Sequence, residues 1–147
     1  MSELKMAPSC KDSEMGILSA IMKDNDKIHD AMSNVESNDF MSRQCRVLFE
    51  TMTHLLKKDK RIDMLTLSDH LKNKNILDDM GGIDFISLVE DFVPTSEALS
   101  HHCNRVRTLS LQRKFIQEMG GYVKKAYDMS EDPSSLLEEA YGSVFNM

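Results

Sequence analysis

The chain has 147 residues, of which 41% are apolar and 29% charged, and it carries a formal charge of −6 with three cysteines and no tryptophan. This length suits one domain with a single modest core, and the composition excludes low-complexity disorder. The acidic balance argues against tight binding of this chain alone to a nucleic-acid backbone. The scattered cysteines exclude a disulfide framework, and the apolar runs are too short to span a membrane. We therefore expect a cytoplasmic chain, with no membrane contact, whose partner is a protein.

The predicted elements after a short lead-in are all helices. Residues 1–12 mix proline, serine and charges without periodicity, so we predict a flexible lead-in. An amphipathic helix is predicted from near Ser13, because Met15, Leu18 and Met22 share one helical face. A second short helix is predicted over residues 26–32.

The segment between residues 39 and 82 carries the clearest turn and cap signals. Ser42 is the predicted N-cap of a helix with apolar residues at helical spacing, and Asp63 is the predicted N-cap of the next one. The basic run 57–61 closes the first of these helices. We interpret it as cations that complement the helix dipole rather than as a nucleic-acid patch. Gly81-Gly82 then predicts a tight turn.

A very long helix is predicted after Pro94, with Thr95 as its N-cap and its end near Asp128. Its first face holds Leu99, Cys103 and Val106. A different seam follows at helical spacing, made of Leu111, Phe115, Met119, Tyr122 and Ala126. Asp132 and Pro133 predict the start of a last helix, whose apolar stripe holds Leu136, Leu137, Ala140, Tyr141, Val144 and Phe145.

These elements predict an all-α fold, with a compact helical head over residues 13–94 followed by an antiparallel helical hairpin over residues 95–147. Two helices cannot bury this much apolar surface against each other, so we expect further contact with the head or with a second copy. The candidate interface residues are Leu111, Phe115, Met119, Tyr122, Leu137, Tyr141, Val144 and Phe145.

The sequence offers no catalytic, cofactor-binding or metal-binding residues. It lacks a Gly-x-x-x-x-Gly-Lys-Ser/Thr phosphate loop, so we expect no nucleotide hydrolysis by this chain. Consecutive helical residues point about 100° apart, so His101-His102-Cys103 cannot grip one ion, and we interpret them as two surface imidazoles beside a buried thiol. A small Cys/His hydrolase remains a weaker alternative, suggested only by five histidines and three cysteines.

Six short motifs, taken together, resemble the N-terminal domain of DnaB-type replicative DNA helicases of bacteria or phages. In the order and spacing of that family they are Pro8 with Glu14, Asp39-Phe40, Ile62-Asp63, Gly81-Gly82, Pro94 and Arg107. The chain departs from the family at Ser13, Cys45 and His102, where alanine, histidine and tyrosine are usual. Gly120-Gly121 inside the predicted hairpin puts its rigidity in question.

The resemblance implies a scaffold for DNA replication. In that family, hairpins pair into dimers, and a trimer of dimers forms a collar that docks the C-terminal, helicase-binding domain of primase, with loader proteins acting nearby. The same resemblance implies that this chain ends where the linker to a C-terminal ATPase domain begins. ATP and magnesium are then expected only in that motor domain, and DNA contact only through the full-length hexamer. The alternative is a free-standing adaptor or inhibitor that binds a replicative helicase.

Overall fold

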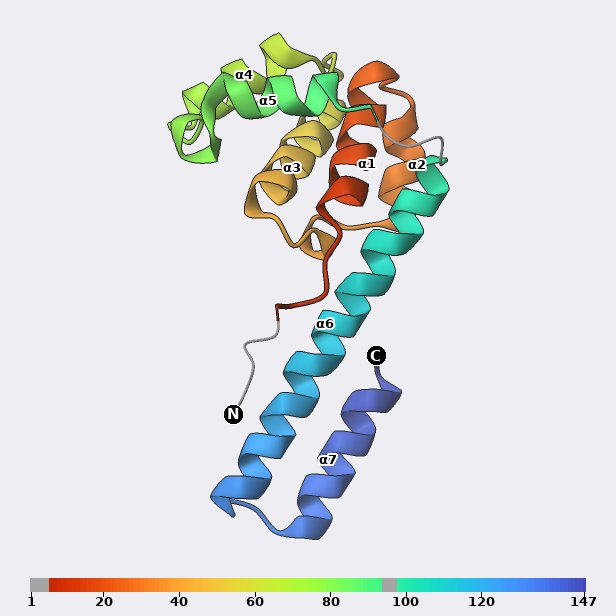
Figure 1. Ribbon diagram of the computed structural model, residues 1–147, viewed down its shortest axis with the longest axis vertical. Coiled ribbons are helices and arrows are strands. Elements are labelled where there is room, and N and C mark those ends of the chain that lie inside the picture. Colours follow the sequence, from red (N-terminus) through yellow and green to blue (C-terminus); the bar gives the residue numbers. More distant parts are fainter. Residues whose placement is uncertain (1–5, 94–97) are drawn as a thin grey trace.

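The computed structural model describes residues 6–93 and 98–147, and every element within these ranges is helical. The elements in chain order are α1 (Lys11–Lys23), α2 (Lys27–Asn34), η1 (Ser37–Asp39), α3 (Arg43–Lys57), α4 (Met64–Asn73), η2 (Asp78–Met80), α5 (Gly82–Asp91), α6 (Leu99–Asp128) and α7 (Pro133–Phe145). A head formed by α1 to α5 sits on one end of α6, and the other end of α6 forms a hairpin with α7 (Figure 1). The predicted all-α fold of head and hairpin is confirmed.

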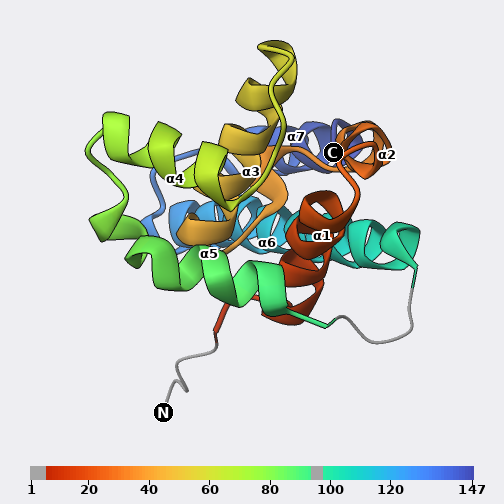
Figure 2. The ribbon, with the colours of Figure 1, turned by 90° about the horizontal axis from the view of Figure 1, so that it is seen from above.

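The core lies in the head, where α1 packs against α2, α3, α5 and α6 (Figure 2). Ile17, Leu18 and Ile21 on α1 have no exposed surface. They pack in one cluster with apolar side chains of α2 to α5 and with Cys103 and Val106 of α6. Burying each large apolar side chain contributes roughly 1.5–3 kcal/mol, so this cluster is the main source of stability. The predicted inner face at the start of the long helix is confirmed.

Local cap and turn signals explain the boundaries of the central helices. The Ser42 hydroxyl accepts a hydrogen bond from the amide of Cys45 at 3.3 Å and so caps α3. The Asp63 carboxylate accepts one from the amide of Thr66 at 2.9 Å, and the Thr66 hydroxyl accepts one from the amide of Asp63 at 3.0 Å. Gly81 and Gly82 adopt φ angles of 93° and 67°, a region that favours glycine. These predictions are confirmed.

The contact between α1 and α6 corrects the interpretation of His102. Its side chain is buried, with 5% of its surface exposed, and its Nδ1 lies 3.2 Å from the Ser13 hydroxyl. A Cβ on Gly16 would lie 3.1 Å from two atoms of the same ring, so the missing side chain lets α6 approach α1 closely. The expectation of a surface imidazole at this position was wrong, because the glycine that makes room for it lies far away in the sequence.

Several boundaries differ from the sequence-based expectation. α1 begins at Lys11, so the last two residues of the predicted lead-in are helical, and α2 runs from Lys27 to Asn34. Asp132 is the N-cap of α7 and Pro133 its first residue, but the Asp132 side chain makes no capping hydrogen bond. The predicted N-cap Thr95 and the motif residue Pro94 lie outside the described residues. α6 does end at Asp128, and it continues unbroken through the glycine pair.

Two histidines at the end of the head predict a pH-dependent stability. The rings of His54 on α3 and His70 on α4 have centroids 4.7 Å apart. Burial lowers the pKa of His70 below its ordinary value of 6.5, and nearby His54, Lys74 and Lys60 lower it further. The unfolded chain therefore binds a proton at His70 more readily than the folded chain does. The free energy of unfolding is thus higher above pH 6.5, and it decreases as the pH falls below that value.

Urea unfolding at pH 7.5 and at pH 5.5 measures this effect. We expect the His70→Gln variant to lose less stability than the wild type between these two values. The exposed His29, changed to Gln, is the matched control. An equal pH dependence for the wild type and His70→Gln would contradict the prediction.

Candidate interaction surface on the helical hairpin

The three cysteines are free thiols in different environments, with Cys10 half-buried and the other two buried. Burial raises the pKa of both Cys45 and Cys103 to about 11, so these thiols stay protonated at neutral pH. The pKa of Cys10 is lowered overall: burial raises it, but Ser13 and Arg105 outweigh that effect. The Cys10 thiol donates a hydrogen bond to the Ser13 hydroxyl at 3.5 Å, and this hydroxyl also lies 3.2 Å from Nδ1 of His102.

No metal centre is present among the described residues, where no three side chains of the ligating types come together. Nor, in the same part of the chain, is any helix long and apolar enough to cross a lipid bilayer.

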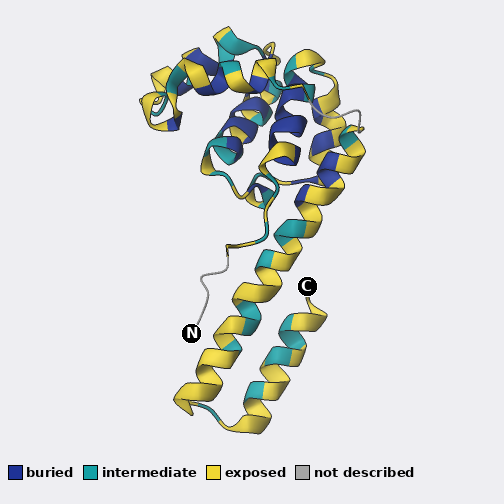
Figure 3. Ribbon diagram, in the orientation of Figure 1, coloured by how far each residue is buried: buried dark blue, intermediate teal, exposed yellow. Residues whose placement is uncertain are grey.

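The eight predicted interface residues fall into two groups. Met119 and Tyr122 on α6 are half-buried, as are Leu136 and Ala140 on α7. The hairpin thus uses part of the predicted seam to hold its own two helices together. The other six predicted residues are exposed: Leu111, Phe115, Leu137, Tyr141, Val144 and Phe145. Figure 3 shows that the buried residues gather in the head and at the adjoining end of α6, whereas the hairpin is largely exposed.

One side of the hairpin is apolar and carries a groove of about 460 Å³. Leu111, Gln112, Phe115 and Ile116 of α6 form one wall, and the remaining lining residues are Val144, Met147 and Pro8. On α7, Leu137, Tyr141 and Phe145 recur at spacings of four, with 72%, 74% and 78% of their surfaces exposed. The rings of Tyr141 and Phe145 are stacked, with centroids 6.4 Å apart.

Sequence reasoning missed two exposed residues of this side, Ile116 and Val123, with 56% and 55% of their surfaces exposed. They lie seven residues apart on α6, which is a detectable helical spacing, but they belong to the face beside the predicted seam. We define the apolar side of the hairpin as Leu111, Phe115, Ile116, Val123, Leu137, Tyr141, Val144 and Phe145.

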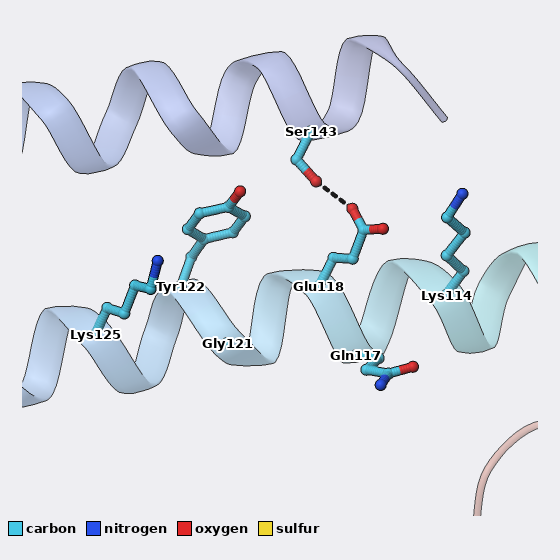
Figure 4. A pocket seen from close by; sticks show the side chains of 7 residues that line it. All are labelled: Lys114, Gln117, Glu118, Gly121, Tyr122, Lys125 and Ser143. Atoms are coloured by element: carbon cyan, nitrogen blue, oxygen red, sulfur yellow. Dashed lines mark hydrogen bonds between the residues drawn. The ribbon is translucent and has the colours of Figure 1, made fainter.

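The opposite side of the hairpin is polar, and its charges are used to hold α7 against α6. It encloses a pocket of about 570 Å³, where Ser143 of α7 donates a hydrogen bond to Glu118 of α6 (Figure 4). The Tyr122 hydroxyl donates one to the carbonyl of Glu139 at 3.2 Å. Lys125 forms ion pairs with Glu131 and Glu139 at 3.3 and 3.5 Å. These contacts link α7 to α6 along the polar side of the hairpin.

Comparison with known families and proteins shows what this chain is similar to. The profile of the family described as "DnaB-like helicase N terminal domain" matches residues 6–108. The replicative DNA helicase DnaB of Buchnera aphidicola subsp. Baizongia pistaciae is 29% identical over 121 residues, which cover 82% of this chain and 26% of that protein. The DnaB of Haemophilus influenzae is 24% identical over 98% of this chain and 31% of that protein. The chain thus spans about a quarter to a third of these relatives.

Two solved structures share the fold. The crystal structure of the N-terminal domain of DnaB helicase from Mycobacterium tuberculosis superimposes with a TM-score of 0.86 at 17% identity, covering 97% of this chain and 100% of that one. The N-terminal domain of DnaB helicase from Helicobacter pylori, whose structure was described together with its interactions with primase, gives a TM-score of 0.70 at 22% identity. It covers 86% of this chain and 99% of that domain.

Proposed function

Because this chain belongs to the family of DnaB-like helicase N-terminal domains, we propose that its hairpin joins two copies through the apolar side and so helps to build the collar of a replicative helicase. In this role the chain is a scaffold. Nucleotide hydrolysis, with its ATP and magnesium, belongs to a motor domain outside this chain, and DNA is engaged only through the complete hexamer.

The observation that carries this proposal is the size and arrangement of the apolar side. Its eight side chains are between 47% and 78% exposed. Together they present an area on the order of 1,000 Å², whereas each partner of a stable interface contributes about 800 Å². A second copy related by a twofold axis would cover this face with the same face and form a four-helix arrangement. Such a surface is unusually apolar for a protein that stays monomeric.

Three such dimers form the proposed collar, and we propose that this collar docks the C-terminal domain of the cognate primase and lies near the site of the helicase loader. The relative from Helicobacter pylori supports the primase part, since its structure was described with primase interactions. The acidic charge of −6 also favours a protein partner over the nucleic-acid backbone.

Sedimentation equilibrium of the 147-residue chain tests self-association directly. We expect a mass that rises from monomer to dimer over the micromolar range. Titration with the C-terminal domain of the cognate primase, followed by calorimetry, tests docking. A strict monomer at high concentration would contradict the proposed self-association. Absence of heat with the primase domain would contradict the proposed docking, so the two proposals are tested separately.

A further inference from the structure

Arg113 ties three distant segments of the chain together at the point where α6 leaves the head. Its guanidinium donates one hydrogen bond to the carbonyl of Pro8 at 2.7 Å and another to the carbonyl of Asp39 at 2.6 Å. Pro8 precedes α1, and Asp39 ends η1. Arginine suits this task because its donors lie in a rigid planar fork, which can serve two acceptors at once.

One of these contacts reaches the apolar groove. Pro8 lines the groove together with residues of α6 and α7, so the chain before α1 forms one of its walls. The carbonyl that Arg113 holds belongs to this same proline. Proline also fixes its own φ angle, which limits the ways this wall can move.

The second contact orients the hairpin. Beyond Val106 the side chains of α6 are no longer buried in the head, whereas η1 still packs beside the helix. The bond from Arg113 to Asp39 therefore anchors α6 to the head seven residues past its last buried side chain. This anchor ties the start of the hairpin to the head, in addition to the packing of α6 against α1 and α2.

We propose that Arg113 is a positioning residue for self-association. It holds Pro8 as a wall of the groove and fixes the direction of the hairpin, so that a second copy meets a complete, preformed surface. Preformed surfaces bind more tightly because less order has to be imposed during association. This inference rests on the proposed function, in which the second copy occupies the apolar side.

The test is the dimer dissociation constant of four altered chains, measured by sedimentation equilibrium. Arg113→Gln is expected to raise the dissociation constant about tenfold, since charge-assisted hydrogen bonds are lost from the anchor. Lys114→Gln removes the same charge at the next residue, which lines the polar pocket, and is expected to leave the constant unchanged. Removal of residues 1–8 is expected to weaken the dimer severalfold, whereas removal of residues 1–5 keeps Pro8 and is expected to have no effect.

A fifth chain separates positioning from general destabilisation. If Arg113 acts partly through Pro8, then Arg113→Gln raises the dissociation constant by a smaller factor in the chain that lacks residues 1–8 than in the complete chain. A loss of stability unrelated to the groove would give equal factors. The helical circular dichroism of each variant, recorded below the dissociation constant, verifies that the monomer is folded.

The outcomes distinguish this inference from the proposed function. A dimer in the wild type that Arg113→Gln leaves unchanged, or equal factors with and without residues 1–8, overturns the positioning role and leaves self-association intact. A wild-type chain that never dimerises overturns both.

Discussion

Replacing Tyr141 with aspartate is expected to convert the dimer into a monomer, with a dissociation constant at least about a hundredfold higher. Tyr141 lies on the apolar side of α7, with 74% of its surface exposed in the single chain. Association would bury the new carboxylate against apolar side chains without a partner, which costs several kcal/mol. Sedimentation equilibrium measures the shift, and thermal unfolding below the dissociation constant is expected to change little, since the side chain is exposed in the monomer.

Ser135→Asp is the matched control for this experiment. It adds the same charge to the same helix, and its position is exposed and about 120° around the helix from Tyr141. This variant is expected to dimerise like the wild type. If Tyr141→Asp also dimerised like the wild type, the contact between copies would have to lie on a different surface.

The second large effect is expected inside the head, from Glu14→Ala. Glu14 is 1% exposed, and its two carboxylate oxygens accept hydrogen bonds from the amides of Met41 and Ser42, both at 3.0 Å. These amides begin the approach to α3, whose N-cap is Ser42. Removal of the carboxylate leaves both without this acceptor. We expect a loss of about 2–4 kcal/mol in the free energy of unfolding, measured with urea.

Two further variants separate the hydrogen bonds of Glu14 from its charge. Glu14→Gln keeps the shape and one acceptor oxygen, so it is expected to lose less stability than Glu14→Ala. Asp12→Asn removes a charge from the exposed side of the same first turn and is expected to cost under about 1 kcal/mol. A stability of Glu14→Ala equal to that of the wild type would show that the two amides find other partners.

Helix boundaries could be predicted from the sequence where the signal was local. Ser42, Asp63 and Pro133 act within one turn of the chain, and each was placed correctly. Pro8 and Glu14 stand out in the sequence only as parts of a family pattern. The roles that the structure gives them depend on partners far along the chain, namely Arg113 for Pro8 and the amides before α3 for Glu14. Periodicity carries no information about such contacts.

The departures from the family pattern show the same limit. Ser13 and His102 lie on two different helices, and in the folded chain they are hydrogen-bonded to each other. The two residues thus meet at the contact between α1 and α6. Neither residue alone indicated that the other was its partner.

The hairpin surface could be predicted only in part. The sequence located the apolar residues of α6 and α7, but their spacing does not say which of them face each other within one chain. Met119 and Tyr122 turned out to lie within the hairpin, whereas Tyr141 and Phe145 point outward. Which face α7 turns toward α6 is a tertiary contact, and a spacing along one helix does not contain it.

Because α6 is continuous, a rotation of the head is transmitted directly to the hairpin. The helix passes from the core of the head through Gly120-Gly121 to Asp128 without a break. Its arm beyond Arg113 is roughly 22 Å long at the standard helical rise, so a tilt of about 10° at that fulcrum would displace the far end by about 4 Å. A rotation too small to disturb the packing of the head would thereby become a displacement comparable to the width of a side chain where two hairpins meet.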